Sequence, residues 1–405
     1  MEFIKQHNPS SVYLESITKN ELLSLMDNIN LRKSPGSDNI GPKLIKDAKN
    51  LLIDPLVYIY NLSFETGIVP SQLKLAKVIP IYKKGSKASP SNYRPISMLS
   101  IFEKLIERLM YNRLIKFLTK FKILNKNQFG FRKSHSTTLA LIEVIDEIYE
   151  NLDNNNHVMG IFLDLQKAFD SVSHSILLDK VYAYGIRGPA HKWLKNYLNN
   201  RTQYVTINGY SSTISTITYG VPQGSILGPL LFLLYINDIS NVIPELKVKL
   251  FADDTNIFLF NKSIESLFVD ASKALDKLNN WFSANKLSLN VDKTHYCIFR
   301  KRGNILDKNI QYPSLTLDNH IIERVNYTKY LGIIVDEFIT FKEHINHLVN
   351  KLKQYCGIFY KFRSRLPKKC LRTIYFAMIH SHLNYGVAIY GNTTTSQLEP
   401  LLKII

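Results

Sequence analysis

Cysteine is scarce in this sequence, and its placement excludes two common stabilising devices. The 405 residues include three cysteines, Cys297, Cys356 and Cys370. They form no CxxC pair, and no histidine follows at zinc-finger spacing, so neither a disulfide framework nor a structural zinc site is predicted. This usage is typical of a reducing intracellular compartment.

Long apolar runs are also missing. The longest, Pro229–Ile236, falls far short of the ~20 residues that a membrane helix needs. The segment Met1–Ser10 contains no apolar stretch of the kind found in signal peptides. We therefore expect no membrane partner, and a location in the cytoplasm or the nucleus.

Acidic residues are few relative to basic ones. The chain has 33 Asp and Glu against 51 Lys and Arg, a formal net charge of +18. Residues 74–133 carry 15 basic residues against two acidic, and residues 341–372 carry nine against one. Two basic blocks around a near-neutral middle favour a groove that grips phosphates, with solvated lysine-rich helix faces as the plain alternative. The predicted partner is nucleic acid, ahead of a membrane surface.

Apolar and aromatic side chains are plentiful. Hydrophobic residues make up 45% of the chain and aromatic residues 11%, which is typical of chains that fold rather than stay disordered. Because 405 residues exceed the usual limit for a single core, about 250 to 300, two or three subdomains are expected.

The residue pattern predicts an α+β protein. Helices are expected from Thr18, where Thr18 and Glu21 have capping-box spacing, and from about Pro42, and helices should dominate to Glu150. The exception is the β-branched run Lys77–Tyr82, a predicted strand. Hairpins favour an antiparallel sheet over a doubly wound parallel one. Further along, strands are expected at 157–163, 203–207, 213–218, 247–251, 256–260, 294–299 and 327–335, and helices at 173–184, 226–239, 264–285 and from 341 onward.

Two adjacent acids, Asp253 and Asp254, follow Phe251-Ala252 in a predicted turn between strands that carry no other charge from Leu250 to Phe260. Adjacent carboxylates repel, so a compensating cation is expected. Oxygen-only ligands suit Mg²⁺, or Mn²⁺, rather than zinc. For an isolated pair of this kind, an ordinary Asp-Asp hairpin turn is the alternative.

A third acid favours the cation. Asp164 ends the apolar run 157–163, so two buried strands are predicted to present their acids side by side. Carboxylates that hold two metal ions about 3.5 to 4 Å apart can activate a 3′-hydroxyl and neutralise a pyrophosphate leaving group, as nucleotidyl transfer requires. Asp170 lies past the strand end, where a helix is expected to begin, and is assigned a structural role.

Six blocks in order resemble the reverse transcriptases of non-LTR retrotransposons of the LINE class, especially the jockey-like invertebrate group. The resemblance implies RNA-directed DNA polymerisation with dNTPs, an RNA template, a DNA primer or nicked target DNA, and Mg²⁺. Among enzymes, a group II intron-type or telomerase-type reverse transcriptase is the alternative. The blocks Gly220–Ser225 and Phe251–Asp254 favour the retrotransposon type over it. The blocks are Asn92–Ser97, Gln128–Arg132, Asp164–Asp170, Gly220–Ser225, Phe251–Asp254 and Tyr330–Gly332.

The resemblance implies roles around the metal. Asp164 and Asp253 bind both ions, Asp254 completes the triad, and Leu165 offers its carbonyl. Lys293 matches the position proposed to protonate pyrophosphate, whereas a surface lysine before a strand is the commoner outcome.

Further roles implied by the resemblance concern the nucleotide and the primer. Arg94 grips the triphosphate, because a guanidinium fork matches phosphate oxygens. Lys83 is a second candidate, with Lys84 as the alternative in register. Phe169 is a steric gate against a ribose 2′-hydroxyl, although such a Phe is more often core filler. Gln223 and Gly224 line the nucleotide pocket, and Tyr330, Leu331 and Gly332 form a primer grip, with an ordinary edge turn as the alternative.

The implied architecture is a right-hand polymerase fold. It comprises helical fingers with an N-terminal extension at 1–157, an antiparallel-sheet palm at 158–338 that includes a fingers-joining segment at about 186–222, and a partial helical thumb at 339–405. The family's upstream endonuclease and a downstream zinc knuckle are not in the sequence, which indicates a polymerase module or a truncated copy. The rival of another class is a catalytically inactive nucleic-acid-binding relic, disfavoured by the intact acids, Arg94 and Gln223.

Overall fold

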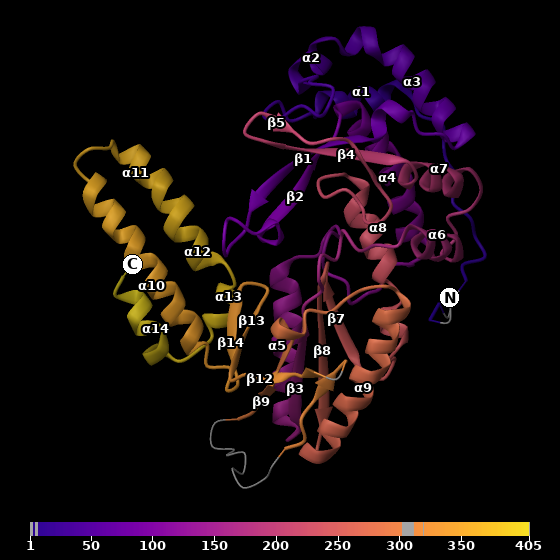
Figure 1. The fold of residues 1–405 in the computed structure, drawn as a ribbon. Helices are drawn as coiled ribbons and strands as arrows, with labels where there is room; N and C mark the ends of the chain where they lie inside the picture. The colour runs from indigo at the N-terminus through magenta and orange to yellow at the C-terminus, as the bar shows by residue number, and fades with distance from the viewer. Residues whose placement is uncertain (1–2, 5–6, 302–311, 319, 405) are drawn as a thin grey trace. The chain divides into compact units, whose positions relative to one another are not determined.

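The computed structural model describes residues 3–4, 7–301, 312–318 and 320–404 of the chain (Figure 1). The chain forms two compact units. Unit 1 comprises residues 1–126, 166–242 and 281–288, and unit 2 comprises residues 127–165, 243–280 and 289–405. Each unit therefore gathers segments that are far apart in sequence.

Unit 1 begins with three helices, α1 (Lys19–Asp27), α2 (Pro42–Asp47) and α3 (Lys49–Thr66). The predicted starts of the first two are confirmed: the Thr18 hydroxyl accepts from the Glu21 backbone N–H at 3.2 Å, and Pro42 occupies the first turn of α2. The Glu21 side chain does not close a capping box, because its carboxylate pairs with Arg113 on α4 (Ile101–Lys120).

The sheet of unit 1 contains β1 (Leu75–Tyr82), β2 (Tyr93–Met98) and β4 (Arg201–Ile207), with the short strands β5 (Tyr210–Ser211) and β6 (Ser215–Ile217) paired to β4. The strand at 77–82 and the hairpin across Asn208-Gly209 are confirmed. The expectation of helix throughout the neighbouring region was wrong for β2. Among the described strands, β2 pairs with β1 alone, at the sheet edge, where Pro95, which lacks a donor N–H, is tolerated.

Helices complete unit 1. They are α6 (His174–Ala183), α7 (Gly188–Leu198), which was not predicted, and α8 (Leu227–Ile236). Nearly every residue of α8 is buried, which explains why its sequence is apolar on all sides. Short 3₁₀ turns lie at Ser71–Lys74, Pro90–Asn92 and Ile239–Asn241.

Unit 2 is built on a five-stranded sheet in the order β12-β9-β3-β8-β7. β3 (His157–Leu163) is its buried centre, paired antiparallel with β8 (Asp254–Asn261) and with β9 (His295–Phe299). β7 (Lys247–Phe251) pairs antiparallel with β8, and the short β12 (Glu323–Arg324) pairs parallel with β9. Among the named strands of this sheet, the predicted antiparallel pairing is confirmed at every neighbour except β12 and β9.

Helix α5 (Thr137–Asp153) packs on β3 and β7 of this sheet. Its Glu143 and Glu147 pair with Lys249 of β7, which is buried, and so tie the strand to the helix. α9 (Ile264–Ala284) runs from unit 2 into unit 1. Among the described residues, no helix has the length and apolar character needed to span a bilayer.

The remaining elements of unit 2 follow β9. They are the short strand pair β10 (Thr316–Leu317) and β11 (His320–Ile321), and the hairpin β13 (Tyr327–Tyr330) and β14 (Ile333–Asp336). The predicted strand-turn pair at 327–335 and the helical tail are confirmed. The tail consists of α10 (Lys342–Phe362), α11 (Lys368–Tyr375), a π-helical turn (Phe376–His380), α12 (Ser381–Asn384), α13 (Val387–Tyr390) and α14 (Thr395–Leu402).

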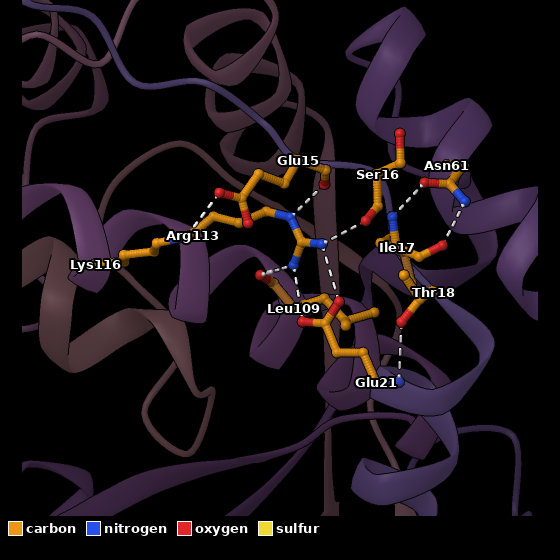
Figure 2. A network of polar contacts seen from close by, with 9 residues as sticks. All are labelled: Glu15, Ser16, Ile17, Thr18, Glu21, Asn61, Leu109, Arg113 and Lys116. Carbon is orange, nitrogen blue, oxygen red and sulfur yellow. Dashed lines mark hydrogen bonds and ion pairs between the residues drawn. The ribbon is translucent and has the colours of Figure 1, made fainter.

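Arg113 of α4 binds the extended segment that precedes α1 (Figure 2). The guanidinium of Arg113 donates to the backbone carbonyls of Glu15 at 2.6 Å and of Ser16 at 3.2 Å. It also donates to both carboxylate oxygens of Glu21 at 3.0 Å each. The Arg113 side chain is 7% exposed, so its guanidinium is largely removed from water, where a charge left without partners is costly.

We expect Arg113→Met to lower the free energy of unfolding of unit 1 by about 2 to 4 kcal/mol, because it removes the shared donor of two carbonyls and of the Glu21 carboxylate. The measurement is urea denaturation followed by tryptophan fluorescence, since both tryptophans, Trp193 and Trp281, lie in unit 1. The control is Lys116→Met, whose pair with Glu15 is exposed. Equal losses in the two variants would contradict the role given to Arg113.

Candidate functional site

The three candidate acids lie at one end of the unit 2 sheet. In the antiparallel register, Leu163 of β3 is opposite Thr255 of β8, and Phe251 of β7 is opposite Asp254. Asp164, which follows Leu163, therefore leaves the sheet at the same end as the turn that carries Asp253. Asp253 and Asp254 are exposed and Asp164 is partly exposed, so solvent reaches all three carboxylates.

The Asp164 backbone is fixed from the segment that precedes β9. The Asn290 backbone N–H donates to the Asp164 carbonyl at 2.7 Å, and Leu165 forms an antiparallel bridge with Leu289. The Lys293 ammonium lies 3.1 Å from Asp164 Oδ2, with the Lys293 side chain 51% exposed. In this structure, then, a cationic side chain is the charge partner of Asp164.

The acids suit a hard divalent cation by their chemistry. All three offer carboxylate oxygens, which are the ligands that Mg²⁺ and Mn²⁺ prefer. Among the described residues, no three His, Cys, Asp or Glu side chains are gathered closely enough to hold a metal ion by themselves. Mg²⁺ is usually bound by one or two carboxylates together with water and substrate phosphates, so a ready-made cage is not required.

The turn Tyr330-Leu331-Gly332 connects β13 to β14. Leu331 and Gly332 have φ values of +44° and +90°, as a tight hairpin turn requires, and the Tyr385 hydroxyl donates to the Leu331 carbonyl. The Tyr330 ring is 4% exposed and packs against Phe162 and Phe258. Burial, with the Asp254 charge as a smaller cause, raises the pKa of its hydroxyl. Tyr330 is therefore a core residue, and the backbone of the turn is its exposed part.

In unit 1, the loop Gly220–Ser225 is held against β2. The Ser97 backbone N–H donates to the Gln223 carbonyl at 2.7 Å. Gly224 has a φ of +116°, and a Cβ there would lie 2.8 Å from the Ser97 carbonyl oxygen. The close backbone approach expected at Gly224 is thus an approach to the protein's own strand.

Two carboxylates also hold this loop: Asp170, to which the sequence pattern assigns a structural role, and Glu107, which it does not single out. The Gln223 side-chain amide donates to Asp170 Oδ1 at 3.0 Å, and the region around Asp170 is a turn, since helix α6 starts only at His174. Burial raises the pKa of the Asp170 carboxyl. Glu107 of α4, fully buried, accepts from the Ile226 backbone N–H at 2.8 Å. The sequence pattern does not reveal the role of Glu107, because it lies within an ordinary helical segment.

The remaining candidates are Arg94 on β2, Lys83 and Lys84 just after β1, and Phe169 in the segment after β3. Arg94 is exposed on β2 opposite Ile81, and Lys83 and Lys84 are exposed just past β1. The Phe169 ring is partly exposed and stacks on Phe232 of α8, with 4.7 Å between ring centroids.

Comparisons with known proteins agree on one family. Residues 81–335 match the family model described as reverse transcriptase (RNA-dependent DNA polymerase). The chain is 30% identical over 413 residues to the RNA-directed DNA polymerase from mobile element jockey of Drosophila melanogaster, covering 99% of this chain and 44% of that protein. It is 30% identical over 394 residues to the probable RNA-directed DNA polymerase from transposon BS of the same fly, covering 94% and 43%. The chain thus spans less than half the length of these relatives.

A buried histidine beside the β13–β14 hairpin gives unit 2 a predicted pH dependence. His344 of α10 is 2% exposed and packs at a tilt against the Tyr390 ring, and its Nδ1 accepts from the Ile334 backbone N–H at 3.4 Å. Burial, with smaller contributions from His347 and Lys329, lowers the pKa of His344 to about 4. Between pH 6.5 and 4 the unfolded chain therefore binds a proton that the folded unit does not.

We expect the stability contributed by neutral His344 to be complete above pH 6.5 and to be lost as the pH falls toward 4. From pH 7 to pH 4.5, wild-type protein should lose about 2 kcal/mol more free energy of unfolding than His344→Phe, which cannot titrate. The measurement is urea denaturation followed by circular dichroism at both pH values. A parallel pH response in His344→Phe would contradict the assignment, and exposed His320→Phe is the control.

Proposed function

The chain belongs to the reverse transcriptase family, and on that premise we propose that it catalyses RNA-directed DNA polymerisation for a non-LTR retrotransposon. The reaction joins a dNTP to the 3′-hydroxyl of a DNA primer or of nicked target DNA, copying an RNA template. The proposal rests on the location of Asp164, Asp253 and Asp254 at the same end of the unit 2 sheet.

Asp164 and Asp253 would hold two Mg²⁺ ions, Mn²⁺ being the alternative, with Asp254 completing the triad and Leu165 contributing its carbonyl. When bound, such ions lower the pKa of the attacking 3′-hydroxyl and neutralise charge on the leaving pyrophosphate. Lys293, whose ammonium lies 3.1 Å from Asp164 Oδ2, would exchange that carboxylate for a phosphate oxygen and supply a proton to pyrophosphate.

Residues of unit 1 would bind the nucleotide. Arg94 and Lys83 are exposed cations suited to triphosphate oxygens, and the guanidinium of Arg94 can make two parallel hydrogen bonds to a phosphate. Gln223 and Gly224 would line the nucleotide pocket, with Asp170 fixing the Gln223 amide. The turn Tyr330-Leu331-Gly332 would support the primer through its backbone, because the Tyr330 ring is buried.

The α+β architecture fits a right-hand polymerase. We assign residues 1–157 to the fingers with an N-terminal extension, 158–338 to the palm, with a fingers-joining segment at about 186–222, and 339–405 to a partial thumb. The basic residues at 341–372, most of them on α10 and α11, would contact the template–primer duplex through its phosphates. The alternative, a relic that binds nucleic acid without turnover, predicts salt-sensitive RNA binding and no extension.

Asp253→Asn should reduce primer extension by more than about a thousandfold, because it removes a carboxylate from the metal ligands. RNA binding should stay near wild type, since phosphate contacts come from basic residues. The assay is extension of a primed RNA template with labelled dNTPs and Mg²⁺, beside filter binding of the RNA. The matched control is Asp276→Asn, the same change at an exposed position of α9. RNA binding without extension in every protein, wild type included, would favour the relic.

Phe169→Val should weaken discrimination between dNTPs and rNTPs by roughly 10- to 200-fold, because a smaller side chain leaves room for a 2′-hydroxyl. The measurement is kcat/KM for dCTP and CTP on one primed template. Phe169→Tyr keeps the bulk and should keep the discrimination. If Phe169→Val loses activity equally with both nucleotides, the ring serves core packing against Phe232 instead.

A further inference from the structure

The segment Asn127–Phe129 lies beside β7 of the unit 2 sheet and extends it by one short parallel pairing. The Leu250 backbone N–H donates to the Asn127 carbonyl at 3.0 Å, and the Phe129 backbone N–H donates to the Leu250 carbonyl at 2.8 Å. Gln128 is the bridge partner of Leu250. The segment is thereby fixed two residues before the turn that carries Asp253.

The Gln128 side chain reaches that turn. Its Oε1 accepts from the Ala252 backbone N–H at 2.9 Å and from the Gly130 backbone N–H at 2.7 Å. Gln128 is 2% exposed and Ala252 4% exposed, so both bonds lie away from water. In a buried setting an amide left without an acceptor costs about 1 to 3 kcal/mol, which makes the contact with Ala252 a strong constraint.

The turn needs this constraint because its backbone is strained. Ala252 has a φ of +55°, a left-handed conformation that costs a residue with a Cβ roughly 1 to 2 kcal/mol. Ala252 and Asp253 are the two residues between the paired Phe251 and Asp254. A two-residue hairpin loop with positive φ at its first position favours glycine there. The conformation of Ala252 fixes the direction in which the next residue, Asp253, leaves the strand.

Gly130 makes the approach possible. A Cβ at Gly130 would lie 2.3 Å from the Ala252 backbone nitrogen, closer than any real contact. The absence of a side chain at this position therefore lets the segment lie against the turn and lets Gln128 reach the Ala252 N–H.

We propose that Gln128 is a positioning residue for the metal-binding acids: its side-chain carbonyl holds Ala252 in the left-handed conformation and so aims Asp253. The inference rests on the proposed function in that Asp253 is taken as a metal ligand. Among the described residues, the Gln128 side-chain N–H finds no acceptor, so the amide acts on this turn through its oxygen.

The test uses Gln128→Met, which keeps the length of the side chain and removes the acceptor, and Gln128→Asn, which withdraws the carbonyl by one methylene. Hydrogen–deuterium exchange without metal should show faster exchange at Ala252 in both variants. The dissociation constant for Mn²⁺, followed by electron paramagnetic resonance of the whole chain, should rise about tenfold or more. Gln354→Met, the same change at an exposed position of α10, should leave both measurements unchanged.

A second change separates positioning from general damage. Glycine adopts positive φ without the steric cost, so Ala252→Gly added to Gln128→Met should recover part of the lost Mn²⁺ affinity. The proposal is overturned if Gln128→Met and Gln128→Asn bind Mn²⁺ within twofold of wild type, or if wild type shows no Mn²⁺ binding that Asp253→Asn removes. If wild type binds Mn²⁺ in a manner that depends on Gln128 but extends no primer, the polymerase function is contradicted and the positioning role of Gln128 is not.

Discussion

The antiparallel register of β3 against β8 is the constraint on which the candidate site depends. With Leu163 opposite Thr255, the residue after β3 and the turn before β8 meet at the same end of the sheet. Side-chain packing supports this register: Val158 to Leu163 are all buried, and Phe162 packs edge-on against Phe258 with 6.0 Å between ring centroids. A slip of one residue would turn these side chains to the opposite faces of the sheet and separate Asp164 from the Asp253 turn.

Several candidate site residues are supported by polar side chains from other segments of the chain. In unit 2 the exposed Asp253 follows Ala252, whose N–H is held by the buried Gln128. In unit 1 the loop with Gln223 is held by Asp170 and by the fully buried Glu107. Each supporting side chain comes from another segment of the chain, so tertiary contacts add to the turn geometry that holds these loops. Such support limits the orientations of the exposed groups, which catalytic and binding sites require.

At two of these contacts the chain has glycine because a Cβ atom would not fit. Gly224 lies against the Ser97 carbonyl of β2, and Gly130 lies against the Ala252 nitrogen. In both places a Cβ would separate the loop from its support. The glycines in the blocks Gln128–Arg132 and Gly220–Ser225 thus serve the packing of backbone on backbone, and the chemistry proposed for these blocks is built on that contact.

The sequence by itself determined the family, the buried strand that ends at Asp164, the acidic turn at Asp253 and the antiparallel hairpins, because these depend on residue types at local spacing. It misassigned β2, since a proline-containing run is a strand only when another strand offers it an edge. It could not show that Tyr330 is buried, nor that Glu107 supports a loop 119 residues away. Only the tertiary structure decided these points, because hydrogen bonds between distant segments leave no periodicity in the sequence that would reveal them.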